Sequence, residues 1–241
     1  MRQGIGRHAP NIAAVATSAP AYRLLMTHGY LPRVRAALLT LALALACAVA
    51  ATSAAAAPAA KKVPLKATFV GDSVSASITY VTSAQAQLER GIDVRLDLKV
   101  CRRLVQPSCP YQGSAPSTAL QAVQSYGRSL GKVLIVKVGY NESSAGYGKG
   151  IDEIMRAARA DGATGVVWVT LRERSDVYHW TNVAIRQATK RWPQLVVADW
   201  NAYSAGKPWF GPDGLHLTPT GATALATFLR PYVLRAADIR A

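Results

Sequence analysis

Apolar residues occur in short continuous runs after residue 65, and between these runs they recur at helical spacing. Continuous apolar runs are typical of strands buried in a parallel sheet, whereas helical spacing is typical of amphipathic helices that cover it. The pattern predicts strands at 66–71, 94–100, 133–136, 165–170 and 195–198. It predicts helices at 75–90, 117–130, 150–160, 177–191 and 219–229, and a long loop at 199–217. Strands that alternate with helices in this way predict an α/β fold with a five-stranded parallel sheet covered on both faces.

The first 57 residues have a different pattern. Arg33 and Arg35 precede an apolar run at 36–51, which small residues follow. A basic flank, a short apolar stretch and small residues at a cleavage point are typical of a secretory signal peptide. The apolar run is shorter than the roughly 20 residues that a membrane span needs. We therefore expect a signal peptide at 1–57, a linker at 58–65 and one domain at 66–241.

Two details of the leader bear on its type. Met26 is an alternative start, because residues 1–25 add nothing that a signal peptide requires. A lipid anchor at Cys47 is disfavoured, since Ala44 stands where a lipidation motif has leucine. The sequence therefore predicts a secreted or periplasmic protein with no transmembrane segment in its mature form.

The charge of the chain limits its partners. The formal net charge is +15 at pH 7. A basic exported protein often meets anionic surfaces, such as cell-wall polymers or lipid head groups. Nucleic acid is disfavoured, because lysine and arginine are scattered and no motif for reading bases occurs. No feature of the sequence predicts an oligomeric state.

Cys101 and Cys109 are the two cysteines that follow the leader. In an oxidising compartment such a pair most often forms a disulfide, here closing a short loop. A metal pair and a reactive thiol are the alternatives, and neither has a supporting histidine or further cysteine nearby. We therefore expect a disulfide and no metal site.

Polar residues with catalytic potential follow the predicted strands. Ser73 stands in Gly71-Asp72-Ser73 after the first strand, Asn141 follows the third, and Asp213 and His216 precede the last helix. The carboxyl ends of parallel strands share one edge of a sheet, where ligands bind. A serine hydroxyl becomes a nucleophile when an imidazole takes its proton, and a carboxylate orients that imidazole. The Ser73 N–H and the Asn141 amide are candidate donors to an oxyanion. Together these residues indicate nucleophilic acyl transfer.

Each of these residues also has a structural interpretation. Ser73 could be only a helix N-cap, and Asp72 only a turn former. Asn141 could merely tolerate a tight turn, and His216 could pack beside the start of the last helix. The catalytic hypothesis depends on the residues acting together.

The motifs Gly71-Asp72-Ser73, Gly139-x-Asn141 and Asp213-x-x-His216, in this order, resemble those of the SGNH (GDSL-type) hydrolase superfamily. The resemblance spans about residues 66–230. It implies a three-layer α/β/α, flavodoxin-like fold and ester hydrolysis or acyl transfer without a metal or an organic cofactor. It also implies that Ser73 is the nucleophile, His216 the base, Asp213 its orienting acid and Asn141 an oxyanion donor.

The sequence departs from the family pattern at three places. Val74 stands where the GDSL form has leucine, and Glu142 where aspartate usually follows the asparagine. The family has a glycine after its second strand whose N–H is an oxyanion donor. Here residues 101–104 read Cys-Arg-Arg-Leu, and no glycine occurs before Gly113. Either another N–H replaces that donor, or the cysteine loop reshapes this side of the site.

Several other residues are candidates for binding substrate. Arg102 and Arg103 could recognise a carboxylate or phosphate, because arginine binds such groups in bidentate fashion, or they could lie in a solvated loop. Tyr140 and Trp209 could stack on a sugar or hold an acyl chain, or they could belong to the core. His179 is predicted to lie in or near a helix outside the site.

The residues together predict an exported serine esterase that cleaves or transfers a small acyl group. An acylated envelope glycan is the first expected substrate, and a lipid or small ester the second. The same residues are compatible with two alternatives: a non-catalytic glycan-binding or cell-wall-binding module on the same fold, and an acyltransferase with a sugar hydroxyl as acceptor.

Overall fold

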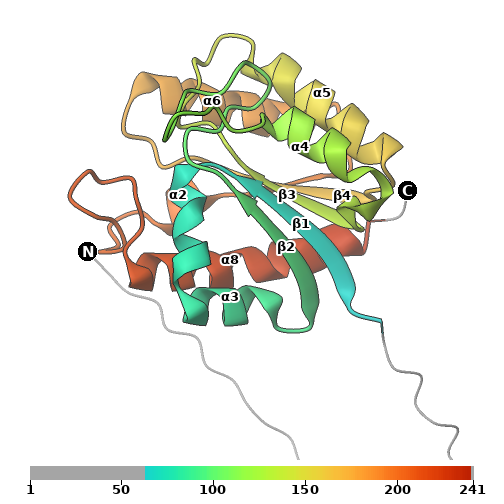
Figure 1. The fold of residues 1–241 in the computed structure, drawn as a ribbon, viewed down its shortest axis with the longest axis horizontal. Helices are drawn as coiled ribbons and strands as arrows, with labels where there is room; N and C mark the ends of the chain where they lie inside the picture. The colour runs from blue at the N-terminus through green and yellow to red at the C-terminus, as the bar shows by residue number, and fades with distance from the viewer. Residues whose placement is uncertain (1–62, 240–241) are drawn as a thin grey trace, which may run out of the picture. The chain divides into compact units, whose positions relative to one another are not determined.

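The computed structural model describes residues 63–239, which contain one five-stranded sheet (Figure 1). All neighbouring strands are parallel, and their order is β2-β1-β3-β4-β5. This is the flavodoxin-like order, so the predicted fold class is confirmed. The strands are β1 (Leu65–Gly71), β2 (Ile92–Leu98), β3 (Val133–Lys137), β4 (Gly165–Val169) and β5 (Leu195–Ala198).

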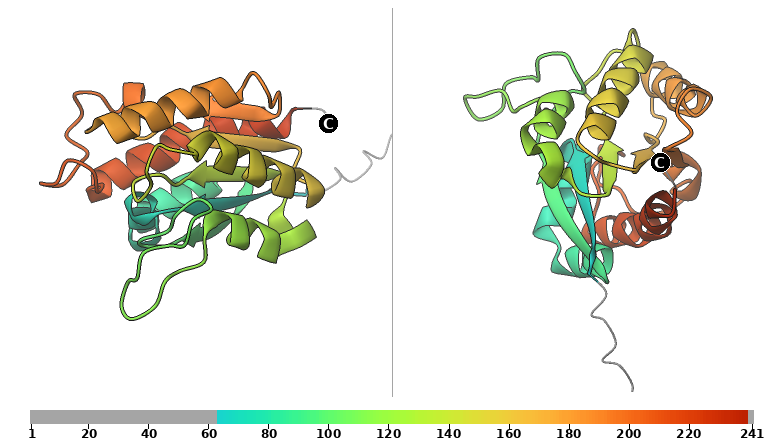
Figure 2. Two further views of the ribbon diagram at one scale, coloured as in Figure 1. Left: turned by 90° about the horizontal axis from the view of Figure 1, so that it is seen from above. Right: turned by 90° about the vertical axis from the view of Figure 1, so that its right-hand side faces the viewer.

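Helices cover both faces of the sheet. Helices α3 and α8 lie on one face and α4, α5 and α6 on the other (Figures 1 and 2). The helices are α2 (Ser73–Ala76), α3 (Thr82–Glu89), α4 (Ala119–Tyr126), α5 (Tyr147–Ala160), α6 (Asp176–Ala188), α7 (Trp200–Tyr203) and α8 (Pro219–Ala237), and the 3₁₀ turns are η1 (Ser77–Tyr80) and η2 (Gly127–Leu130).

The central strand β3 explains the continuous apolar runs of the sequence. Val133 and Ile135 belong to the core beneath α8, whereas Leu134 and Val136 belong to the core beneath α4 and α5. Because side chains alternate between the two faces of a strand, a sheet covered on both faces needs apolar residues at successive positions.

The helix predicted at 75–90 is wrong, because the segment is interrupted. Helix α2 passes into η1, and Val81 is extended (φ −122°, ψ 97°) before α3 begins. The hydroxyls of Ser77 and Thr79 donate to backbone carbonyls three residues earlier, at 3.1 and 2.5 Å. Such local bonds compete with regular helix geometry, and the β-branched residues around Val81 lower helix propensity further.

The predicted start of the next helix is also wrong. Thr118, not Ser117, is the N-cap of α4, and it forms a capping box with Gln121. Ser117 instead accepts a hydrogen bond from the Arg102 guanidinium (3.2 Å). The capping interaction is local, but the partner of Ser117 lies 15 residues away in sequence and could not be predicted from the pattern.

Several further elements have other bounds than predicted. Strand β2 occupies 92–98 because its pairing with β1 runs from Leu65–Ile92 to Gly71–Leu98. Helix α5 begins at Tyr147 and α6 ends at Ala188. Helix α8 continues through Pro231 to Ala237 because its last turns are buried against the sheet. The predicted loop 199–217 contains the short helix α7.

The predicted signal peptide (1–57) and most of the predicted linker (58–65) lie outside the described residues. Within residues 63–239, no helix combines the length and apolar character needed to cross a membrane.

The loop before α8 packs directly on that helix at Gly221. A Cβ atom added at Gly221 would overlap the backbone carbonyl of Trp209, whose oxygen accepts the Thr218 N–H (2.9 Å). A Cβ atom added at Gly148, in the first turn of α5, would meet nothing within 4 Å. The two glycines therefore form a matched pair of helical positions, one crowded and one open.

We expect Gly221→Ala to lower the free energy of unfolding by roughly 1–3 kcal/mol, because backbone atoms must move to admit the methyl group. Gly148→Ala should raise it by about 0.5–1 kcal/mol, since alanine loses less conformational entropy in a helix than glycine. Urea denaturation of both variants measures these changes. Equal effects at the two positions would contradict the close packing at Gly221.

Candidate active site

The predicted site residues lie at the carboxyl edge of the sheet, where β1 and β3 are neighbours. Ser73 begins α2 directly after β1, and Asn141 lies in the loop that follows β3. In the order β2-β1-β3-β4-β5 the connections leave β1 and β3 in opposite directions, which opens a crevice at this edge. The strand order therefore brings together two of the three predicted motifs.

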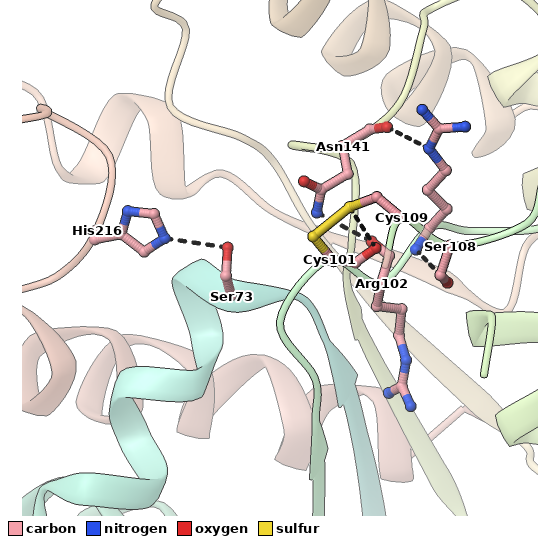
Figure 3. The surroundings of a disulfide bond; sticks show 8 residues. Ser73, Cys101, Arg102, Ser108, Cys109, Asn141 and His216 are labelled. Atoms are coloured by element: carbon pink, nitrogen blue, oxygen red, sulfur yellow. Dashed lines mark hydrogen bonds between the residues drawn. A yellow bond between two sulfur atoms is a disulfide. The ribbon is translucent and has the colours of Figure 1, made fainter. Parts of the chain in front are cut away.

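His216 bridges Ser73 and Asp213. Its Nδ1 lies 2.5 Å from the Asp213 Oδ2, and its Nε2 lies 3.1 Å from the Ser73 Oγ (Figure 3 draws the second contact). A carboxylate only accepts hydrogen bonds, so Nδ1–H donates to Asp213 and the Ser73 hydroxyl donates to Nε2. The His216 side chain is 55% exposed. The hydrogen bond between His216 and Ser73 therefore lies near the surface, where a substrate can reach the Ser73 hydroxyl.

Hydrogen bonds within residues 211–216 fix the loop that carries His216. Gly211 N–H donates to the His216 carbonyl (2.8 Å), and Asp213 Oδ1 accepts the N–H groups of Leu215 (2.9 Å) and His216 (3.0 Å). The Leu215 N–H and the His216 donors lower the pKa of Asp213 to about 2. Asp213 is therefore an anion throughout the neutral range.

Arg172 supports the same loop from the end of β4. Its guanidinium donates to the Gly214 carbonyl (2.9 Å) and lies 3.7 Å from the ring centroid of Phe210. The next residue, Glu173, pairs with His179 (3.1 Å). The support that Arg172 gives to the loop has no signal in the sequence pattern, because Gly214 lies 42 residues further along the chain.

Asp72 forms hydrogen bonds that link the turn carrying Ser73 to the loop after β3. Its buried carboxylate accepts the N–H groups of Val74 (3.2 Å), Gly139 (3.0 Å) and Tyr140 (3.2 Å). Burial raises the pKa of Asp72, while the charge of Lys137 and the three N–H groups oppose that rise. The interpretation of Asp72 as a turn former was incomplete, since two of its three partners lie on another strand connection.

Lys137 ends β3 and is fully buried. Its Nζ has no hydrogen-bond partner among residues 63–239 and lies 4.6 Å from the ring centroid of Tyr140. Burial lowers the pKa of Lys137 to about 8, against the opposing attraction of Asp72. The sequence signal for this residue was a lysine at the end of an apolar run, and it was not recognised.

Residues 101–104 and the loop after β3 are joined by three hydrogen bonds. Asn141 Nδ2 donates to the Arg102 carbonyl (3.2 Å), and Arg103 Nε donates to the Asn141 carbonyl (2.7 Å). Leu104 N–H donates to the Glu142 carboxylate. A side-chain amide has two N–H groups, so this pairing leaves Asn141 one further donor. Arg103 is thus part of the support of Asn141.

The suggestion that Arg102 binds a substrate anion is wrong. Its side chain is fully buried, and its guanidinium donates to the Asp97 carboxylate (2.9 Å), the Asp97 carbonyl (2.5 Å) and the Ser117 carbonyl (3.0 Å). Removing one partner of a buried ion pair costs about 3–5 kcal/mol. Arg102 therefore anchors the segment whose carbonyl positions Asn141.

The predicted disulfide between Cys101 and Cys109 is present, with a Cα–Cα distance of 5.2 Å (Figure 3). Cys101 has φ +64°, a conformation that glycine adopts readily and other residues rarely do. The segment that lacks the expected glycine thus keeps a backbone conformation typical of glycine. Figure 3 shows the Ser73 hydroxyl between His216 on one side and the disulfide with Asn141 on the other.

Tyr140 and Trp209 both make contacts within the protein. The Tyr140 hydroxyl accepts the Arg172 N–H (2.7 Å), and the Tyr140 ring meets Tyr178 edge-on at 5.1 Å. Trp209 stacks on the buried Trp200 at 5.7 Å. Their role in binding substrate stays a prediction. Among residues 63–239, no group of three His, Cys, Asp or Glu side chains is suited to hold a metal ion.

We expect the double variant Cys101→Ala/Cys109→Ala to lose roughly 2–3 kcal/mol of unfolding free energy, because the short loop is no longer closed in the unfolded chain. Cys101→Gly/Cys109→Ala also lacks the bond but accepts φ +64° without strain. It should be more stable than the alanine variant by about 1 kcal/mol. Denaturant unfolding of both variants checks the order, and a less stable glycine variant would contradict the role assigned to this backbone.

Lys137→Met removes a buried ammonium and keeps an unbranched side chain. The folded-state pKa of Lys137, about 8, lies below its ordinary value of 10.5, so the unfolded chain binds more protons between these pH values. The contribution of Lys137 to stability therefore rises with pH above about 8. The free energy of unfolding of the wild type, relative to that of Lys137→Met, should therefore rise by up to about 1.4 kcal/mol per pH unit from pH 8 to 10.

Urea unfolding at several pH values measures this difference. Lys132→Met, at an exposed lysine that precedes the same strand, is the control for the loss of one lysine charge. A pH-independent difference for Lys137→Met would show that the buried ammonium does not titrate in this range.

No protein-family model and no curated protein sequence matches the chain. Solved structures do match. The C-terminal catalytic domain of Streptococcus pneumoniae peptidoglycan O-acetyltransferase A has a TM-score of 0.55 at 19% identity, over 73% of this chain and 95% of that domain.

Two further solved structures are similar. A carbohydrate acetylesterase family member from Sinorhizobium meliloti has a TM-score of 0.56 at 13% identity, over 72% of this chain and 99% of that one. The psychrotrophic esterase EstA from Pseudoalteromonas has a TM-score of 0.52 at 12% identity, over 70% of this chain and 96% of that one. These likenesses, together with the observed strand order, show that residues 63–239 share an α/β fold with these three proteins.

Proposed function

We propose that this protein is an exported serine esterase that removes or transfers a small O-acyl group through a covalent acyl-enzyme. The observation that carries the proposal is the hydrogen-bonded chain from Ser73 through His216 to Asp213, with contacts of 3.1 and 2.5 Å. Nucleophile, base and orienting acid within hydrogen-bond reach of one another are the arrangement that serine acyl transfer requires.

In the first step the Ser73 Oγ attacks the ester carbonyl carbon while His216 Nε2 takes the hydroxyl proton. Asp213, an anion at neutral pH, accepts the Nδ1–H bond and stabilises the imidazolium that forms. Collapse of the tetrahedral intermediate breaks the ester C–O bond, and His216 returns the proton to the departing alcohol. The acyl group then remains on Ser73 until an acceptor with a hydroxyl group removes it.

The oxyanion of the intermediate needs donors fixed before the reaction begins. We assign this role to the N–H of Ser73 and to the remaining N–H of the Asn141 amide. The Arg102 carbonyl accepts from that amide, and Arg103 donates to the backbone carbonyl of Asn141. Asp72 holds the backbone two residues before Asn141. Asn141 therefore needs no rearrangement when charge develops on the substrate.

The expected substrate is an acylated envelope glycan, with a small ester as the second choice. Among the similar structures, one is named for peptidoglycan O-acetylation and one as a carbohydrate acetylesterase, which supports this class. The net charge of +15 would favour association with an anionic envelope. The signal-peptide pattern at 1–57 and the disulfide support export.

An acyltransferase is the second candidate, and the similarity to an O-acetyltransferase domain favours it. The chemistry on this chain would be the same up to the acyl-enzyme, and only the acceptor would change from water to a sugar hydroxyl. A non-catalytic binding module is less well supported, because such a module has no need for His216 within 3.1 Å of the Ser73 hydroxyl.

We expect Ser73→Ala to lower kcat for p-nitrophenyl acetate by at least about 10³-fold, because the nucleophile is lost. Ser77→Ala, one turn further along the same segment, removes a hydroxyl that bonds only the Val74 carbonyl and should keep activity within about twofold. Steady-state kinetics and circular dichroism of both variants test the assignment. Full activity of a folded Ser73→Ala protein would remove it.

A further inference from the structure

A pocket beside the site is not used by the chemistry described above. It has a volume of about 440 Å³ and is lined by α2 and η1, by the end of β2, and by the loop at 100–116. This loop, green in Figure 2, stands out from the body of the domain in both views. The volume falls within the range of about 300–1,000 Å³ that is typical of small-molecule sites. We refer to it as the tyrosine pocket, after Tyr80 and Tyr111 in its lining.

The tyrosine pocket begins one helical turn from the nucleophile. Ala76, which lines it, follows Ser73 by three positions in α2, and residues so spaced lie on one face of a helix. Tyr80 ends η1 on the same continuous segment. A molecule whose ester lies at the Ser73 hydroxyl can therefore extend along α2 into the pocket.

The lining combines exposed aromatic rings with polar groups. Tyr80 is 83% exposed and Tyr111 is 46% exposed. Lys99, Gln112 and Ser114 add an ammonium, an amide and a hydroxyl to the same lining. An acyl chain would leave these polar groups without water or partners, which is costly. Sugar rings suit both components, because their C–H faces stack on aromatic rings and their hydroxyls exchange hydrogen bonds with the polar groups.

The loop that carries Tyr111 has a defined backbone. Tyr111 and Ser114 exchange two backbone hydrogen bonds, at 2.8 and 3.2 Å. Between them Gln112 (φ +51°) and Gly113 (φ +85°) both have positive φ, as in the tight two-residue turns that close hairpins. The Cys101–Cys109 disulfide closes the chain just before this turn. Tyr111 is therefore held in place although it lies outside the hydrophobic core.

We propose that the tyrosine pocket binds pyranose rings of the glycan that carries the scissile acyl group, with Tyr80 and Tyr111 as stacking surfaces. The proposal rests on the proposed function, which places an ester at Ser73, and adds where the sugar chain lies. The glycan then runs from Ser73 along α2 toward the loop at 100–116.

The test compares four esters: p-nitrophenyl acetate, p-nitrophenyl octanoate, O-acetylated xylotetraose and O-acetylated chitotetraose. For Tyr80→Ala/Tyr111→Ala, the ratio of kcat/KM for an acetylated oligosaccharide to kcat/KM for p-nitrophenyl acetate should fall roughly tenfold, which corresponds to the loss of two stacking contacts. Tyr80→Phe/Tyr111→Phe keeps both rings and should preserve the ratio. The two oligosaccharides differ in sugar type, so the larger effect identifies the preferred glycan.

Trp180→Ala is the matched control, because Trp180 is a 57% exposed aromatic residue on α6. It should change the ratio by no more than about twofold. A fall in the ratio for Trp180→Ala, but not for the tyrosine variant, would overturn the proposal and place the glycan along α6. The tyrosine variant could instead be slower than the wild type with p-nitrophenyl octanoate but not with the acetylated oligosaccharides. That result would also overturn the proposal, since the pocket would then hold an acyl chain.

Binding to catalytically inactive protein separates this proposal from the proposed function. Calorimetric titration of the folded Ser73→Ala protein with xylotetraose and chitotetraose should give a Kd that rises roughly tenfold when Tyr80 and Tyr111 are also replaced by alanine. Equal affinity with and without the tyrosines, or no binding of either sugar, would overturn the pocket assignment. Failure of the wild type to cleave any of these esters, with or without an acceptor sugar, would instead overturn the proposed function.

Discussion

The geometry of the candidate site depends on one buried carboxylate. Asp72 accepts hydrogen bonds from Val74, on its own turn, and from Gly139 and Tyr140, on the connection after β3. A carboxylate can be kept in the interior only when donors or charges compensate the loss of water. Here three N–H groups and the nearby ammonium of Lys137 do so. The requirement to satisfy Asp72 thus fixes the position of the Ser73 turn relative to the loop that carries Asn141.

The two sides of the crevice are supported in different ways. On one side, Gly211, Asp213 and Arg172 fix the loop of His216 through contacts to its backbone. On the other side, the buried Arg102 anchors residues 101–104 to Asp97 in β2 and to Ser117 just before α4, and its carbonyl orients Asn141. Ser73 and His216 remain partly exposed, whereas Asp72 and Arg102, which hold the turn and the loop on the Asn141 side, are fully buried. This division is expected of a site that must admit substrate yet stay organised before it arrives.

The loop at 100–116 has two consequences for the site. Near its start lies Cys101, whose positive φ is typical of glycine. Further along, it places Tyr111 in a pocket next to α2. The disulfide ties both parts together, because it links Cys101 to Cys109 just before the turn at Gln112. One covalent constraint therefore supports the oxyanion side of the site and the proposed sugar-binding surface.

The sequence by itself determined which segments become strands, the fold class and the residues that meet at the site. The buried runs and the motifs around Ser73, Asn141 and His216 are local patterns, and parallel strands deliver such motifs to one edge whatever their order. Only the tertiary structure decided the order β2-β1-β3-β4-β5, the burial of Arg102 and Lys137, and the left-handed backbone of Cys101. The strand order and the proximity of Lys137 to Asp72 join segments far apart in sequence, whereas Arg102 is held by Asp97 and Ser117, which lie 5 and 15 residues away. A charged residue is expected to face solvent until the fold supplies such partners.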